Sequence, residues 1–180
     1  MSAWFWNGLL HPLWATSHVM CLITLALLSV QCGRLGMRAL WFALTPSLIL
    51  GLLLTRLISL PQSDYYLLAA SVFIGSIIAL RPPRLPLSIL IFAALLVGLF
   101  IGLASTAPSL PGMKTHQMAE HLVAVALGSG LMLVSAQVIA YFLNKPWQGL
   151  AVRILGAWIT AGASMVLALM LLVPLSPLKP

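Results

Sequence analysis

Acidic residues are almost absent from this chain: Asp64 and Glu120 are the only two among 180 residues, against nine Lys and Arg. Charged residues of both signs make up only 6% of the sequence, whereas 62% is hydrophobic, and the mean hydropathy is +1.11. A soluble domain needs more charged residues than this on its water-facing surface. The composition therefore excludes a soluble fold. We therefore predict an integral membrane protein in a lipid bilayer, whose cations set its orientation rather than bind nucleic acid.

Motifs for enzyme chemistry are also missing. The sequence has no CxxC pair, no phosphate-cradling glycine loop, no redox-cofactor motif and no Ser/His/Asp arrangement. Cys21 and Cys32 lie eleven residues apart, which on one helix is about 16 Å of rise and too far for a disulfide. No Lys or Arg precedes Arg34, so the basic region of a secretory signal is missing and the first segment is interpreted as a retained helix. We predict a protein that is not an enzyme.

Apolar runs predict six membrane helices. A spanning helix needs roughly 20 apolar residues, and stretches such as "CGRLGMR", "LPQSDY" and "RPPRLP" separate the runs with breakers and polar groups. The expected fold class is all-α, a single six-helix transmembrane domain over residues 1–180. Its spans are expected at about residues 13–31, 39–60, 66–80, 87–104, 121–143 and 154–173.

Positive charge is distributed unevenly between the connections. One side holds only Lys114 and Lys179, with Arg56 close to a helix end. The first, third and fifth connections hold Arg34, Arg38, Arg81, Arg84, Lys145 and Arg153. Because positive loops favour the cytoplasm, both termini are predicted to lie outside, in the periplasm of a bacterium with the chain in its inner membrane. All four histidines and both carboxylates then belong to the outward half.

The stretch "HPLWATSH" places His11 and His18 at the start of the first span. Residues seven apart share one face of a regular helix but lie about 10.5 Å apart along its axis, so one metal ion cannot bridge them. Two functional interpretations remain open: Pro12 marks the true helix start and His11 folds back from a loop, or each histidine serves a separate step of a path. A third makes His11 an interfacial residue in an aromatic belt with Trp4, Trp6 and Trp14.

A second polar cluster, "HQMAEH", runs from His116 to His121. His116 and Glu120 meet on one face if the fifth span begins early, whereas His121 points about 100° away. Imidazole and carboxylate ligands together suit Ni, Co, Zn or Cu. A plainer interpretation is a polar helix start with Glu120 near the positive end of the helix dipole. Asp64, in "PQSDYY", is interpreted as a loop or cap residue.

Small residues recur at the spacing that lets membrane helices pack closely. Gly98 and Gly102 form a GxxxG pair, and Ser71 and Gly75 have the same spacing. In lipid, such residues let two backbones approach each other. They serve either ordinary packing within the bundle or a helix face for another membrane-protein subunit.

The N-terminal segment "NGLLHPLWATSHVMCLITLALLSVQCGRLGMRALW" resembles the opening of the HupE/UreJ family of nickel and cobalt permeases. That family typically begins with G-[FL]-x-H-P-x-x-G-x-D-H, followed by an apolar helix and a proline-bearing second span. The match by position comprises Gly8, His11, Pro12 and His18. The resemblance continues as six spans over nearly the whole chain.

The sequence departs from the family pattern at several ligand positions. Ala15 and Ser17 stand where the pattern has glycine and aspartate. A second family motif, H-G-x-A-H-G followed by a glutamate, falls on "LFIGLASTAPSLP", where Ile101 and Ser105 replace the histidines. The chain therefore lacks an aspartate and two histidines of the expected ligand set.

Two functions follow from the resemblance and its departures. The first is divalent-metal transport, with nickel or cobalt as the transported ion rather than a resident cofactor. Its outward-facing entry site would comprise His11, His18, His116, Glu120 and His121. The second is a transport-inactive relative that became an accessory subunit of a larger membrane complex.

Overall fold

Helices are the only regular elements in the computed structural model, which describes residues 3–55, 57, 63–80, 85–105, 115–145 and 149–172. This confirms the all-α fold class. In chain order the helices are α1 (Ala3–Trp14), α2 (Thr16–Gln31), α3 (Gly33–Leu54), α4 (Ser63–Leu80), α5 (Leu87–Ala104), α6 (Thr115–Asn144) and α7 (Leu150–Leu172).

Among these described helices, α3 to α7 are each long and apolar enough to cross a membrane. The pair α1 and α2 makes a sixth candidate span if the two are taken together, although they are bent by 68° relative to each other. Large apolar side chains cover the outside of the bundle, such as Phe42 with 83% of its surface exposed and Trp158 with 76%. Water does not cover so much apolar surface favourably, and these helices are long and apolar enough to span lipid, so the chain is an integral membrane protein.

The helices differ from three of the predicted spans. The first span, expected as one helix over residues 13–31, begins at Ala3 and is broken at Ala15. The second begins at Gly33 rather than 39 and ends at Leu54 rather than 60, and α6 begins at Thr115 rather than 121. Hydropathy marks only the apolar part of a helix, whereas a helix continues into the interface where its polar side chains reach water.

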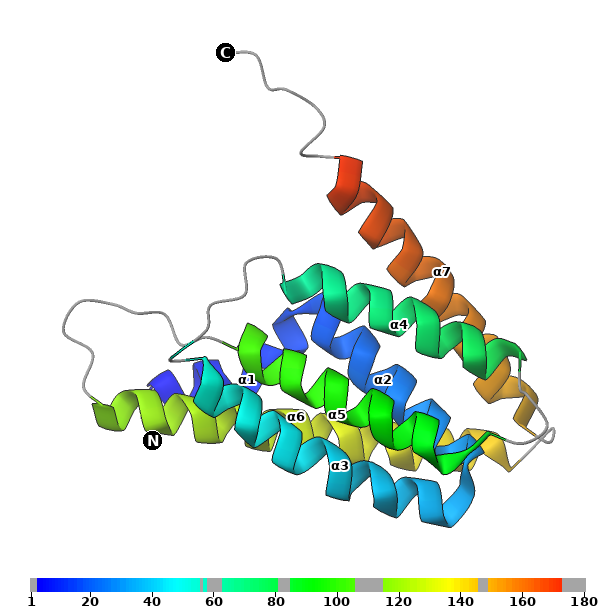
Figure 1. Ribbon diagram of the computed structural model, residues 1–180, viewed down its shortest axis with the longest axis horizontal. Coiled ribbons are helices and arrows are strands. Elements are labelled where there is room, and N and C mark those ends of the chain that lie inside the picture. Colours follow the sequence, from blue (N-terminus) through cyan, green and yellow to red (C-terminus); the bar gives the residue numbers. More distant parts are fainter. Residues whose placement is uncertain are drawn as a thin grey trace.

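Helix α2 occupies the centre of the bundle and contacts every other described helix (Figure 1). Its side chains from Leu25 to Leu28 are almost completely buried. Helices α3, α4, α5 and α6 pack around it, while α7 lies against α4 at the edge. The residues of α2 are therefore enclosed by protein rather than by lipid.

Glycines allow α3 and α5 to pack with their backbones in contact. A Cβ atom at Gly102 would lie 2.6 Å from the carbonyl oxygen of Leu48 and 2.7 Å from the Cα of Gly51. A Cβ atom at Gly98 would likewise meet the Leu44 carbonyl oxygen at 2.9 Å. The GxxxG pair of this span therefore serves packing within the bundle.

Two further helix pairs also pack closely at glycines. In the α4–α7 pair, a Cβ atom at Gly75 would lie 3.0 Å from the carbonyl oxygen of Gly156. In the α1–α6 pair, a Cβ atom at Gly128 would collide with the backbone carbonyl of Leu9. Close contact with α6 therefore fixes the direction in which α1 runs.

The buried side-chain amide of Gln137 links three helices by hydrogen bonds at the end of the bundle where α2 turns into α3. Gln137 of α6 donates from Nε2 to the Ser29 hydroxyl of α2 at 3.1 Å. Its Oε1 accepts a hydrogen bond from the Trp41 indole of α3 at 2.9 Å. Interhelical hydrogen bonds of this kind help to fix the packing of membrane helices.

We expect Gln137→Leu to lower the free energy of unfolding by about 1–2 kcal/mol, because it removes the interhelical hydrogen bonds to Ser29, Trp41 and Met37 and leaves the Trp41 indole without its acceptor. Unfolding in mixed micelles with rising SDS measures this change. Ser135→Ala is the matched control on the same helix, because the exposed Ser135 hydroxyl bonds only to the carbonyl of Met132 in its own helix. Equal stability of Gln137→Leu and the control would contradict the assigned role.

Candidate functional site

A helix break at Ala15 brings the two N-terminal histidines together. Ala15 has an extended backbone, with φ −83° and ψ 103°, and no side chain caps the start of α2. The chain bends by 68° there. As a result, the ring centroids of His11 and His18 lie only 5.4 Å apart, much closer than the separation of about 10.5 Å along a straight helix.

This geometry corrects one of the interpretations of the "HPLWATSH" stretch. His11 does not fold back from a loop, because it lies inside α1 together with Pro12. The break falls three residues after the proline, at a residue without a capping side chain. It follows from tertiary packing: α1 lies along α6, whereas α2 runs through the centre of the bundle.

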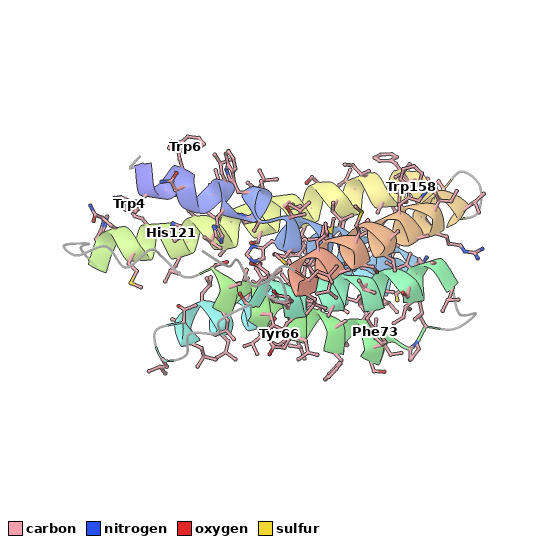
Figure 2. All side chains as sticks on the ribbon, turned by 90° about the horizontal axis from the view of Figure 1, so that it is seen from above. Trp4, Trp6, Tyr66, Phe73, His121 and Trp158 are labelled. Atoms are coloured by element: carbon pink, nitrogen blue, oxygen red, sulfur yellow. The ribbon has the colours of Figure 1, made fainter. Side chains whose placement is uncertain are left out.

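His121 of α6 joins the same cluster. Its ring centroid lies 6.2 Å from that of His11, and the residue is only 4% exposed. Figure 2 shows His121 where α1 lies along α6. Gly8 makes this approach possible, because a Cβ atom there would lie 2.6 Å from the His121 carbonyl oxygen and 3.0 Å from its Nδ1. We call His11, His18 and His121 the histidine cluster.

Most ring nitrogens of the histidine cluster are buried without a hydrogen-bond partner in the described part of the chain. These five atoms are Nε2 of His11 and both nitrogens of His18 and of His121. A buried polar group left unpaired costs about 1–3 kcal/mol, so such groups are rare in folded proteins. These unpaired nitrogens make the histidine cluster the candidate functional site of the chain.

A carboxylate from α4 reaches the same cluster. The hydroxyl of Ser17, the residue before His18, donates to Oδ1 of Asp64 at 2.5 Å. Asp64 lies in the first turn of α4 rather than in a loop, where the helix dipole favours a negative charge.

His116 and Glu120 form a separate pair on the outside of α6. Nδ1 of His116 lies 3.2 Å from Oε1 of Glu120, and the His116 side chain is 81% exposed. The predicted meeting of these two residues on one face is confirmed, because α6 begins early enough to include both. His121 lies on a different face of the helix and points into the bundle. The five sequence-predicted residues thus fall into an inner cluster and an outer pair.

The cluster offers donors that suit a transition-metal ion. Imidazole nitrogens and a carboxylate are ligands for Ni, Co, Zn or Cu. The ring planes meet at 65° and 63°. Within the described residues, no group of three or more His, Cys, Asp or Glu side chains is arranged to hold a metal ion. The side chains of the cluster would therefore have to move for three of them to coordinate one ion.

The apolar helices define an integral membrane protein that holds histidine side chains inside its helix bundle. The family model described as HupE / UreJ protein matches residues 1–167. The chain therefore belongs to the HupE/UreJ family, as its N-terminal segment predicts, and is a metal-transporter-like membrane protein. No curated protein and no solved structure matches it significantly.

The two positions where the second family motif has histidines carry no imidazole here. Ile101 and Ser105, at the end of α5, are both fully buried. The Ser105 hydroxyl donates to the Ile101 carbonyl oxygen at 2.7 Å. These positions therefore contribute packing and a hydrogen bond within the helix.

Proposed function

We propose that the chain binds a divalent cation, nickel or cobalt, at the histidine cluster and carries it across the membrane. The observation that carries this proposal is the set of five buried ring nitrogens without a partner. Ionisable side chains inside membrane bundles are costly and mark pathways for ions. Family membership supports transport of a metal, and the nitrogen ligands favour nickel and cobalt over magnesium or calcium.

The proposed orientation places the cluster on the entry side of a bacterial inner membrane, with both termini in the periplasm. The charge distribution supports this, because the described cations at the opposite end, where α2 turns into α3 and α6 into α7, are Arg34, Arg38, Lys145 and Arg153. The other five, Arg56, Arg81, Arg84, Lys114 and Lys179, lie outside the described residues.

Uptake by cells tests the transport proposal. Cells that express the chain should accumulate nickel or cobalt above the level of cells without it. The double variant His11→Ala/His18→Ala should return accumulation to that background, because it removes two of the three imidazoles of the histidine cluster. Immunoblots of the membrane fraction verify equal amounts of protein. Wild-type accumulation by the double variant would refute the proposal.

A second candidate function is that of an accessory subunit in a larger membrane complex. The observation that favours it is the exposure of α7. Only 11% of the most apolar stretch of α7 is buried inside the bundle, whereas the corresponding share is 33% to 39% for α3 to α6. Such a helix offers a lateral face to another membrane protein. Mild extraction in a gentle detergent should then yield a complex larger than the single chain, and recovery of the free monomer alone would count against this candidate.

A further inference from the structure

We infer that Asp64 is the carboxylate ligand of the histidine cluster and that Ser17 is the residue that positions it. This inference rests on the proposed function and deepens it, because it names the group that gives the site its negative charge. The juxtaposition involves two helices that are distant in sequence: Ser17 lies in the first turn of α2 and Asp64 in the first turn of α4.

The contact between Ser17 and Asp64 places the carboxylate beside the cluster. Ser17 is only 4% exposed, and its neighbour His18 only 1%. The Ser17 hydroxyl donates to one carboxylate oxygen at 2.5 Å. An ionised carboxylate has about four acceptor positions on its two oxygens, so this bond fixes the group while leaving acceptor capacity for a cation.

Charge balance explains why the cluster needs this carboxylate. Neutral imidazoles bind a metal but supply no negative charge, and a divalent ion taken out of water needs compensation. The sequence has only one other carboxylate, Glu120, which pairs with His116 on the outside of α6. Asp64 is held by the hydroxyl of Ser17, the residue next to His18. It is therefore the acidic group placed to stabilise a bound cation.

Because the two side chains are so close, the carboxylate can be moved from position 64 to position 17. Because the Ser17 hydroxyl touches the Asp64 carboxylate, an aspartate at position 17 would bring its carboxylate to nearly the same place from the opposite helix. The variant Ser17→Asp/Asp64→Asn therefore moves the negative charge across the contact. The net charge of the chain stays the same.

Titration of the purified full-length chain with Ni²⁺ tests the inference. Asp64→Asn keeps the shape and a hydrogen-bond acceptor for Ser17 but removes the charge, and we expect it to weaken binding about 100-fold. The swap variant Ser17→Asp/Asp64→Asn should recover affinity to within about tenfold of wild type. Glu120→Gln is the matched control, and it should change affinity less than about threefold because Glu120 lies outside the cluster.

Variants at position 17 test the second part of the inference, that Ser17 positions the Asp64 carboxylate. Ser17→Ala should weaken Ni²⁺ binding about tenfold, and Ser17→Thr, which keeps the hydroxyl, should bind like wild type. If the wild-type chain binds Ni²⁺ and Asp64→Asn binds it with the same affinity, the inference about Asp64 is overturned while the proposed function stands. Absence of saturable Ni²⁺ and Co²⁺ binding by the wild-type chain would overturn the proposed function, and with it the inference.

Discussion

His18→Ala is expected to lower the affinity of the purified chain for Ni²⁺ about 100-fold or more. His18 is the most deeply buried histidine, at 1% exposure, and neither of its ring nitrogens has a hydrogen-bond partner within the described chain. Its ring lies next to that of His11. Removal of this imidazole therefore takes away a central ligand of the proposed site, which calorimetric titration measures directly.

The matched control for this prediction is His116→Ala. His116 is also a histidine of the same half of the bundle, but it is exposed and paired with Glu120, so its loss should change affinity less than about threefold. Equal losses in the two variants would contradict the assignment of the site to the histidine cluster. His18→Leu, moreover, should unfold within about 1 kcal/mol of wild type in the absence of metal, because it replaces an unpaired buried group.

Gly102→Ala is expected to destabilise the bundle by roughly 3 kcal/mol, the upper range for overpacking. The added methyl would lie 2.6 Å from the Leu48 carbonyl oxygen, 2.7 Å from the Gly51 Cα and 2.7 Å from the Leu52 nitrogen. All three atoms belong to the backbone of α3, which cannot rotate away as a side chain can. SDS unfolding in mixed micelles, and the yield of monodisperse protein, measure the loss.

Gly162→Ala provides the comparison. The nearest atom to a Cβ there is the terminal methyl carbon of Met20 at 3.6 Å, an ordinary contact with the flexible end of a side chain. Alanine also favours a helix over glycine by about 1 kcal/mol. The control should therefore be as stable as wild type or more so. If Gly102→Ala were as stable as Gly162→Ala, the close packing of α3 on α5 would be contradicted.

The sequence contains enough information to predict the fold class, the family and the outer pair. Apolar runs of helical length predict an all-α membrane protein. The four-residue spacing of His116 and Glu120 predicts their contact, because residues four apart lie on one face of a helix. The same periodicity turns His121 away from them. Local geometry is sufficient for each of these predictions.

The break at Ala15 and the contact of Ser17 with Asp64 could not be predicted in this way. Ala15 is neither glycine nor proline and has no capping side chain, so the break depends on how α1 packs against α6. Ser17 and Asp64 are 47 residues apart, and no local pattern indicates that α4 begins beside α2. The composition gave only one indirect signal, which is that Asp64 is one of two acidic residues in the whole chain.

The central claim is that the histidine cluster binds a metal ion. The X-ray absorption spectrum of Ni²⁺ bound to the purified wild-type chain tests it most directly, because scattering from imidazole rings differs from that of water or carboxylate oxygens. We predict a nickel ion coordinated by more than one imidazole, with this signal reduced in His18→Ala. A spectrum with only oxygen ligands, or the same imidazole signal in both proteins, would contradict the account.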